Sequence, residues 1–465
     1  MLIAPHYEAL YGRANIKKLR WGFIPYGLAC IGGKLRFDGH NVKIIDTTCS
    51  ISSWNEIEEV IKKESPDYLG VSITTPQAPG GLKICEITKR IKPNCITVIG
   101  GPHASALPEE MLSDKNVDIV VIGEGEITMS QITKGISLTD IKGIYYKKGD
   151  CIIKNQPQEL IDDLDRLPFP LYEQLPIERY GTPYMGRSIG IITGRGCPFS
   201  CSFCASKVIF GKRCRLRGIA SILEEIAWFK NRYGIKSFSF WDDTFTIQKD
   251  RIKKLCEELI NNDFNITWSC TTRVDSLSLE LLKAMKEAGC CVIHLGIESG
   301  DAFVLEKTQK RITLEQVENA VKWARSLDIE TYGYFILGLP YETKDTLIKT
   351  INLAKKLKLD YAQFALLTPL PGTEIWGLAK QGKVLKFTSN DLGGFSRYGE
   401  AIIELPDIPN RVLNRYYRKA YFDFYFRWGY FIQTFKKINS FDKAVLYIKM
   451  FLGLLKFLSS DLTSD

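Results

Sequence analysis

The chain of 465 residues is long enough for two or three domains, and 45% hydrophobic with 25% charged residues is an ordinary globular composition. A net charge of +9 fits a solvated Lys/Arg-rich surface, and no basic patch with interleaved aromatics indicates a nucleic-acid partner, although the C-terminus approaches one. The N-terminus has no signal-peptide pattern, and no window predicts a transmembrane helix.

Residues 24–125 alternate short apolar runs with segments of helical periodicity. The runs typical of strands are 41–46, 68–74, 96–101 and 118–126. This βαβ alternation predicts a doubly wound, Rossmann-like parallel sheet in an α/β domain of residues 1–135. Ligands of such sheets bind beyond the carboxyl ends of the strands, so the loops of interest are 5–12, 74–81, 100–105 and 123–126.

Residues 136–186 differ in character from the first domain. Residues 143–156 have the pattern of a small hairpin, and the Pro-rich stretch 162–176 cannot be continuous helix. We therefore expect a hairpin followed by an extended linker.

The alternation resumes in residues 187–376. Strand candidates are 188–194, 237–243, 266–272, 292–298, 331–338 and 361–368, with amphipathic helices between them. Six such units predict a partial (β/α)6 TIM-type barrel with functional residues at the strand C-termini. Residues 377–465 are predicted to form a mainly helical C-terminal region.

Three of the thirteen cysteines are spaced like metal ligands. Cys197, Cys201 and Cys204 form a C-x3-C-x2-C pattern directly after the first strand of the second series. Three thiolates on one loop can hold three irons of a cubane cluster and leave the fourth iron open to an exogenous molecule. Phe203 can shield such a cluster from water. A structural zinc site is the alternative, and Cys214 is its only nearby fourth ligand.

The motif, with an aromatic residue before its last cysteine, resembles the radical S-adenosylmethionine (SAM) superfamily. In that family a [4Fe–4S] cluster binds SAM through the open iron and cleaves it reductively to methionine and a 5′-deoxyadenosyl radical. The resemblance implies that Cys197, Cys201 and Cys204 are the catalytic cluster ligands. Downstream segments match in the expected order over about 190 residues, including the PGT of residues 371–373.

The resemblance assigns SAM contacts to residues at the ends of the next two strands. Asp242 and Asp243 match positions that offer polar groups to the SAM amino group, although Asp243 or Thr244 could equally cap a helix. Arg273 could reach the SAM carboxylate with its guanidinium group. A solvent-facing salt bridge is the other interpretation of Arg273.

The ribose and adenine contacts follow on the fourth and fifth strands. Glu298 and Ser299 match partners of the ribose hydroxyls. Ile336 and Gly338, in GYFILGLPYET, match the strand that packs beside the adenine ring.

The N-terminal domain resembles the cobalamin-binding domain that precedes many radical SAM barrels. Carried over to this chain, its cofactor contacts are Thr74, Gly100, Gly101, His103, Gly123 and Glu124. The glycines remove side chains where a planar corrin must approach the backbone. None of the four histidines lies in a D-x-H-x-x-G motif, so no histidine ligand to cobalt is predicted. A domain that kept the fold and lost cobalamin remains an alternative.

Residues 411–458 are dense in aromatic and basic side chains. Their helical spacing fits either a pair of helices that closes over the barrel, or contact with an anionic membrane surface or a hydrophobic substrate.

The resulting functional prediction is a radical SAM enzyme that, with cobalamin, C-methylates an apolar or ring-containing small molecule. The alternatives are a cobalamin-free oxidoreductase or cyclase and a non-enzymatic iron–sulfur redox sensor. Methylthiolation of tRNA is disfavoured, because the N-terminal cysteines lack cluster-ligand context and no RNA-binding barrel is evident. The resemblance implies a flavodoxin or ferredoxin as electron donor. We expect a cytoplasmic protein, with contact to the membrane periphery through residues 411–458.

Overall fold

The computed structural model describes residues 1–5, 22–49, 53–182, 184–389, 391–395, 400–435, 445, 447–448 and 451–455. The chain divides into two compact units. The first unit is Met1–Asp243 with Pro369–Gly377 and Asp391–Ser396; the second is Thr244–Thr368 with Leu378–Asn390 and Arg397–Asp465. The boundary falls inside the predicted barrel rather than near residue 187, because the cysteine-bearing segment packs with the N-terminal sheet.

A seven-stranded sheet forms the core of the first unit, in the order β2-β1-β3-β4-β5-β6-β7. Its parallel strands are β1 (Leu2–Ala4), β2 (Ile44–Asp46), β3 (Tyr68–Ser72), β4 (Ile96–Gly100) and β5 (Ile119–Val121). The predicted hairpin, β6 (Ile144–Lys148) and β7 (Cys151–Lys154), extends this sheet by antiparallel pairing with β5. It belongs to the sheet because β5 would otherwise be an exposed edge.

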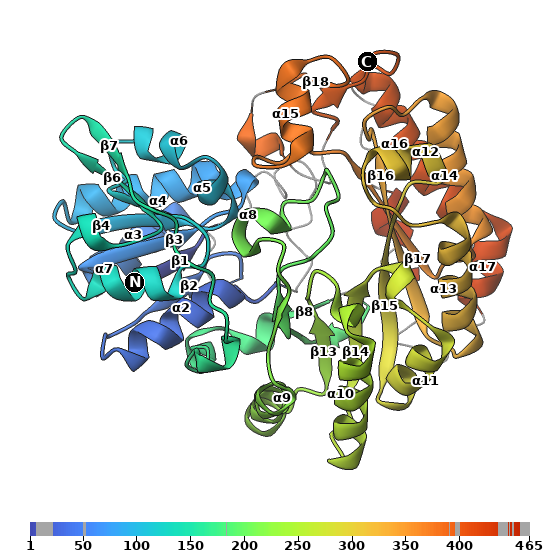
Figure 1. Cartoon of the computed structure of the whole chain (residues 1–465), viewed down its shortest axis with the longest axis horizontal. Coiled ribbons are helices and arrows are strands. Elements are labelled where there is room, and N and C mark those ends of the chain that lie inside the picture. The colour runs from blue at the N-terminus through green and yellow to red at the C-terminus, as the bar shows by residue number, and fades with distance from the viewer. Residues whose placement is uncertain are drawn as a thin grey trace. The chain divides into compact units, whose positions relative to one another are not determined.

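Helices lie on both faces of this sheet, as its apolar strands require (Figure 1). They are α2 (Tyr26–Phe37), α3 (Trp54–Glu64), α4 (Ala78–Ile91), α5 (Pro102–Ala106), α6 (Pro108–Ser113) and α7 (Glu126–Thr133). The Ser53 side chain accepts the Glu56 N–H and caps α3. On the inner face of α3, Ile57 and Ile61 are buried against the sheet.

The Pro-rich stretch is not the extended linker that the sequence predicts. It forms short 3-10 turns, η3 (Leu164–Arg166), η4 (Tyr172–Gln174) and η5 (Ile177–Arg179). The Leu171 N–H donates to the Ala29 carbonyl at 2.9 Å, and the Tyr180 hydroxyl donates to Asp46 at 2.8 Å. The prolines exclude continuous helix, but Leu171, Tyr172 and Leu175 between them are buried and fix the segment in place.

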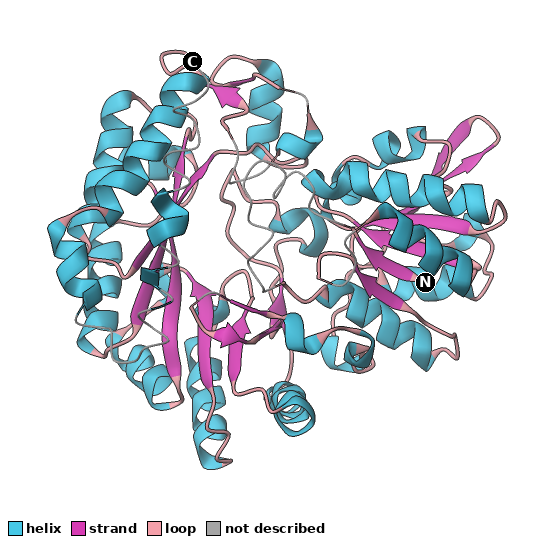
Figure 2. Ribbon diagram, turned by 180° about the vertical axis from the view of Figure 1, so that it is seen from behind, coloured by secondary structure: helices cyan, strands magenta, loops and turns pink. Residues whose placement is uncertain are grey.

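The second strand series begins in the first unit with β10 (Ile189–Ile191) and β13 (Ser237–Phe240), which pair in parallel. It continues in the second unit with β14 (Thr267–Thr272), β15 (Cys290–Glu298), β16 (Glu330–Leu337) and β17 (Tyr361–Leu366), all parallel. Helices α9 (Ile219–Tyr233), α10 (Lys249–Asn261), α11 (Leu279–Glu287), α12 (Ala302–Lys307), α13 (Leu314–Ser326) and α14 (Lys344–Lys356) alternate with these strands. In Figure 2 the helices of the second unit lie along the outer side of its strands.

Helices α15 (Glu374–Gln381), α16 (Asn410–Tyr425) and α17 (Trp428–Phe435) follow, with a short antiparallel pair, β18 (Lys386–Phe387) and β19 (Ile403–Glu404). Helices α16 and α17 cover the outermost strand, β17. The hydroxyls of Tyr421, Tyr425 and Tyr430 donate to strand-side carbonyls at 3.0, 2.8 and 3.1 Å. These bonds satisfy an edge that would otherwise be open. Among the described residues, no helix has both the length and the apolar character needed to span a bilayer.

Candidate functional site

The cysteine loop follows β10 and a two-residue strand, β11 (Gly194–Arg195), which pairs antiparallel with β12 (Arg215–Leu216). A tight turn closes it, since the Cys204 N–H donates to the Cys201 carbonyl at 3.1 Å. The loop then enters the short helix α8 (Ser206–Phe210). Cys201 is buried, whereas Cys197 and Cys204 are half-buried.

The three thiols are close enough to influence one another. Burial raises the pKa of Cys204 to about 11, and Asp243, Cys201 and Cys197 act in the same direction. No three His, Cys, Asp or Glu side chains of the described residues are grouped tightly enough to hold a single metal ion. Three thiols on one short loop fit a cubane cluster, which spreads its ligands over several irons, better than the single ion of a zinc site.

Asp242 and Asp243 stand beside this loop in the first unit. Asp242 accepts the Thr193 backbone N–H at 2.6 Å and the Thr193 hydroxyl at 2.5 Å, so it fixes the chain just before β11. Asp243 is exposed and accepts the Ser206 hydroxyl at 2.5 Å. Their role toward the SAM amino group stays a prediction.

Two more predicted features lie against the loop. Phe203 is half-buried within it. The PGT segment belongs to the same compact unit, and beyond it the Ile375 N–H donates to the Ser202 carbonyl at 3.2 Å.

The predicted cobalamin side is the carboxyl edge of the first sheet. Thr74 is half-buried and donates its hydroxyl to the Gln77 side-chain carbonyl at 2.8 Å. A Cβ at Gly123 would meet nothing nearer than the Ile209 carbonyl at 3.9 Å, so this position leaves open space beside α8. At Gly100 a Cβ would make only ordinary contacts of 3.7 Å with Val121. Residues 6–12, the first of the predicted loops, lie outside the described residues.

His103 is fully enclosed on this edge. Its Nδ1 lies 3.3 Å from the Thr75 hydroxyl, and its Nε2 has no hydrogen-bond partner among the described residues. Burial lowers the pKa of His103 to about 4, so the imidazole is neutral at neutral pH. The His103 Nε2 is buried inside the protein, 4.0 Å from the Glu110 carboxylate. The open space at Gly123 is therefore the observation that fits a large cofactor at this edge.

Glu124, predicted as a cobalamin contact, binds two arginines of the chain instead. Its carboxylate forms buried ion pairs with Arg195 and Arg215, the two cross-strand partners of the β11–β12 hairpin. Burial alone would raise the pKa of Glu124, but the hydrogen bond from Arg215 and the charge of Arg195 outweigh burial and lower that pKa.

The remaining SAM-side residues belong to the second unit. Arg273 is buried, so the interpretation of this residue as part of a solvent-facing salt bridge is wrong. Its Nε and one Nη donate to the Asp275 carboxylate at 2.9 and 2.8 Å, and the same Nη donates to the Lys310 carbonyl at 2.8 Å. Glu298 has a left-handed backbone (φ 67°) at the end of β15 and accepts from Lys310 Nζ at 2.8 Å. Arg273 and Glu298 are thus linked through Lys310.

Ser299 faces the packed interior. Its hydroxyl lies 3.3 Å from the Thr350 hydroxyl on α14 and accepts the Asp301 N–H at 3.2 Å. Ile336 is half-buried near the end of β16, and Gly338 directly follows that strand with φ 94°. Contacts of these residues with ribose and adenine stay predictions.

Sequence reasoning missed three residues of these networks. Asp275 and Lys310 hold Arg273 and Glu298, and the buried Glu342 accepts the Gly338 and Leu339 N–H groups at 2.6 and 3.1 Å. Asp275 lies two residues after Arg273, a spacing that could have been noticed. Lys310 lies outside any motif, and only the folded chain brings it to Glu298.

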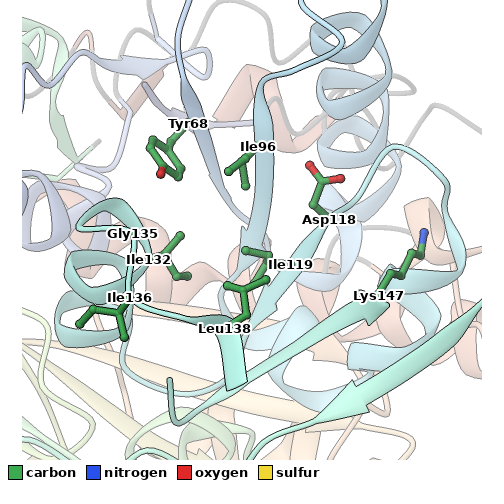
Figure 3. A pocket seen from close by; sticks show the side chains of 9 residues that line it. All are labelled: Tyr68, Ile96, Asp118, Ile119, Ile132, Gly135, Ile136, Leu138 and Lys147. Carbon is green, nitrogen blue, oxygen red and sulfur yellow. The ribbon is translucent and has the colours of Figure 1, made fainter. Parts of the chain in front are cut away.

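One cavity, of about 290 Å³, lies away from all these residues (Figure 3). Tyr68, Ile96 and Ile119, the first residues of β3, β4 and β5, line it, so it opens at the amino edge of the sheet. Apolar residues on and after α7, including Ile132 and Ile136, complete the wall. The cavity is therefore at the sheet edge opposite the predicted cobalamin side.

Comparison with known proteins agrees with this geometry. The family model of the radical SAM superfamily matches residues 191–354, and the model of the B12 binding domain matches residues 12–133. An uncharacterized methyltransferase of Pyrococcus horikoshii is 36% identical over 87% of this chain and 88% of its own length. The anaerobic magnesium-protoporphyrin IX monomethyl ester cyclase of Rubrivivax gelatinosus is 30% identical over 81% and 69%.

A solved structure shows the same fold. OxsB, a cobalamin-dependent SAM radical enzyme with aqua-cobalamin and SAM bound, matches with a TM-score of 0.74 at 18% identity. The match covers 98% of this chain and 71% of that one. The predicted fold class, a Rossmann-like sheet followed by a partial barrel, is confirmed. The chain belongs to the radical SAM superfamily, among the members that carry a B12-binding domain, and is an enzyme whose cofactors are a [4Fe–4S] cluster, SAM and cobalamin.

Proposed function

We propose that this enzyme C-methylates an apolar or ring-containing small molecule. The observation that carries the proposal is that the cysteine loop and the open carboxyl edge of the B12-type sheet belong to one compact unit. Helix α8, which follows the cysteines, packs against α5 of that edge. When bound, the cofactors would supply a strongly reducing electron and a carrier for a methyl group.

The chain's own residues have separate tasks in this proposal. Cys197, Cys201 and Cys204 hold three irons and leave one open to SAM. Arg273 and Glu298, oriented through Asp275 and Lys310, bind the polar groups of SAM. The buried position of Arg273 excludes water from its guanidinium group, which strengthens its pairing with a carboxylate.

An aromatic surface on the second strand series supports an apolar ring as substrate. Tyr332, Tyr334 and Ile336 alternate along β16 and therefore share one face of the strand. The His294 ring stacks on Tyr332 at 5.0 Å between centroids, and its Nδ1 lies 3.0 Å from the Tyr334 hydroxyl. Burial lowers the pKa of His294 to about 4, so this surface is uncharged at neutral pH.

Cyclase-type oxidoreductase chemistry is the second candidate. A cyclase that is 30% identical over 81% of this chain favours it. The two candidates differ in the fate of the SAM methyl group, which reaches the product only in a methyl transfer.

The decisive experiment uses protein purified anaerobically with hydroxocobalamin, a low-potential reductant and methyl-deuterated SAM. We expect bound cobalamin, formation of 5′-deoxyadenosine, and deuterated methyl groups on the corrin cobalt. Cys201→Ala should lose both iron and 5′-deoxyadenosine formation, while the matched Cys214→Ala should keep them. Cobalamin that never acquires deuterium, with 5′-deoxyadenosine still formed, would point to the cyclase alternative. Flavodoxin or ferredoxin should replace the chemical reductant.

The C-terminal helices support a further part of the proposal, contact with an anionic bilayer. On α17, Trp428, Phe431, Ile432 and Phe435 recur at helical spacing, and Trp428 and Phe435 are 83% and 78% exposed. The opposite face docks through Tyr430 and Gln433, whose side chains bond to the chain at Asp360. Lys358, just after α14, adds positive charge nearby, since its carbonyl accepts a hydrogen bond from Gln433.

This part is tested by sedimentation with vesicles of phosphatidylglycerol and phosphatidylcholine. We expect binding to anionic vesicles that weakens as salt is raised, as electrostatic attraction to lipid requires. Trp428→Ala combined with Phe435→Ala should abolish it, while Phe303→Ala, at another exposed aromatic, should not. Equal binding of the double variant would refute the assignment.

A further inference from the structure

Four buried charged side chains join the cobalamin-side edge to the cysteine loop within the first unit. Arg195 donates to Glu124 at 2.7 Å and to Glu126 at 2.6 Å, and Arg215 donates to the second oxygen of Glu124 at 2.7 Å. All four side chains are at most 6% exposed. Such a cluster must be explained, because burying charges costs free energy even when they are paired.

The Glu124 carboxylate is bound and enclosed by the chain itself. Besides the two arginines, the Ile161 N–H donates to it at 2.9 Å. Oε1 accepts from Arg195, Oε2 accepts from Arg215 and Ile161, and the Glu124 side chain is only 2% exposed, so the chain itself encloses both oxygens. Glu124 therefore has a task other than the cobalamin contact that its position in the loop predicts.

The two arginines are the cross-strand pair of the hairpin that opens the cysteine loop. Arg195 pairs with Arg215 in the β11–β12 register, and Arg195 lies two residues before Cys197. Because Glu124 binds one arginine on each strand, it holds β11 and β12 in a fixed arrangement. The planar guanidinium fork makes such pairs directional, so they fix orientation as well as distance.

The other end of the contact is the loop after β5. Gly123, directly before Glu124, faces the open space of the cobalamin-side edge and donates its N–H to the Ser105 hydroxyl at 3.0 Å. Glu126 is the first residue of α7. A displacement of this loop by a ligand at the edge would therefore be transmitted directly to the hairpin.

We propose that Glu124 and Glu126 are positioning residues that couple occupancy of the cobalamin-side edge to the geometry of the cysteine loop. The inference rests on the proposed function only in taking cobalamin as the ligand of that edge. An apolar contact of equal size could stabilise the fold as well. It would not fix the orientation of the hairpin, which is why we assign the ion pairs a role in coupling.

The test follows iron release from the reconstituted [4Fe–4S] holoenzyme to a ferrous chelator, with and without bound cobalamin. In the unchanged protein we expect cobalamin to slow iron release at least threefold. Glu124→Gln should release iron at least threefold faster than the unchanged protein and lose the protection by cobalamin. Asp38→Asn is the matched control, because the Asp38 side chain is only 6% exposed and its carboxylate pairs with two lysines, one on α2 and one after α7. It should keep both rates.

Electron paramagnetic resonance of the reduced cluster gives a readout that loss of stability alone would not move. The spectrum should change on cobalamin binding in the unchanged protein and in Asp38→Asn, but not in Glu124→Gln. If Glu124→Gln fails to fold, Arg195→Lys keeps the charge without the bidentate fork and should show the same loss. Unchanged iron release and an unchanged cobalamin response in these variants would overturn the proposal. If the unchanged protein binds no cobalamin, the proposed function fails, whereas faster iron release from Glu124→Gln would still support its grip on the hairpin.

Discussion

Glu342 is a buried carboxyl whose ionisation opposes folding. Burial raises its pKa to about 8, although the Gly338 and Leu339 N–H groups act in the opposite direction. Its Oε1 has no hydrogen-bond partner among the described residues. Because the folded state holds the proton more tightly than the unfolded state, the stabilisation is complete below about pH 4.5 and is lost as pH rises toward 8.

We therefore expect the free energy of unfolding to fall between pH 6 and pH 8, and Glu342→Gln to remove that loss. One pKa unit is worth about 1.4 kcal/mol, so between pH 6 and pH 8 the free energy of unfolding should fall by about 2 kcal/mol more in the unchanged protein than in the variant. Anaerobic urea unfolding at the two pH values measures the difference. Glu257→Gln, on the exposed side of α10, should leave the pH profile unaltered, and parallel profiles for all three proteins would contradict the assignment.

Substitution of two glycines of the cobalamin-side edge should have different effects, one on stability and the other on cobalamin binding. Gly101 has φ 94°, and a Cβ there would lie 2.7 Å from the Ile73 carbonyl oxygen, which as backbone cannot move aside. Gly123 has φ 78° but open space around it. Gly101→Ala should cost more than about 2 kcal/mol of stability, since strain and collision add.

Gly123→Ala should cost only the strain of about 1–2 kcal/mol, but should weaken cobalamin binding because the methyl group enters the edge. Gly39→Ala, at φ 92° in open space between α2 and β2, carries the same strain away from the edge. Cobalamin titration of the folded variants measures the effect. Equal affinity of Gly123→Ala and Gly39→Ala would show that the corrin does not approach Gly123.

What the sequence reveals at this scale depends on how local the chemistry is. The cysteine motif can be recognised from the sequence, because one short loop carries all three residues, Cys197, Cys201 and Cys204. The partners of Glu124 cannot be predicted from the sequence, because Arg195 and Arg215 are 71 and 91 residues away and only the fold brings them to the carboxylate.

At the scale of elements, the packed Pro-rich stretch behaves as part of the core. Tyr172 is fully buried, and its hydroxyl donates to Glu225 of α9, which also pairs with Arg217. Tyr172→Phe keeps the ring packing but removes a donor to a buried carboxylate. We expect a loss of about 1.5–3 kcal/mol in the free energy of unfolding. The control is Tyr233→Phe, in the same aromatic cluster, which should change stability by less than about 0.5 kcal/mol. Similar values for both would indicate that the hydroxyl contributes nothing.

The elements that the sequence predicted best are those with a simple repeat. The strand at 68–74 became β3 (Tyr68–Ser72), and the segment of helical periodicity before it became α3, capped by Ser53, because apolar runs and helical periodicity decide such segments locally. The stretch 162–176 was misjudged, because proline excludes helix without revealing that the intervening leucines are buried. The hairpin of residues 143–156 was recognised, but its pairing with β5 was not, since register between distant strands leaves no local signal.

At the scale of the whole molecule, the predicted cofactor contacts are divided between the two units. The cysteine loop and the B12-type edge belong to the first unit, whereas Arg273, Glu298 and Gly338 belong to the second. Alternation along the chain predicted both α/β series correctly but could not reveal that the cysteine-bearing βα unit packs with the N-terminal sheet. Buried side chains such as Arg195 and Tyr172 cause that association.

This distribution predicts where cobalamin protects the backbone from hydrogen exchange. A ligand at 100 times its Kd stabilises the form that binds it by about 2.7 kcal/mol, which slows exchange through opening of that site about 100-fold. We expect protection in residues 72–77, 100–105 and 121–126, measured by mass spectrometry on the anaerobic holoenzyme. Residues 144–154, the β6–β7 hairpin at the far edge of the same sheet, should exchange unchanged. Protection of residues 132–138 instead would place the ligand in the cavity at the amino edge of the sheet and would contradict the rule that such sheets bind at their carboxyl ends.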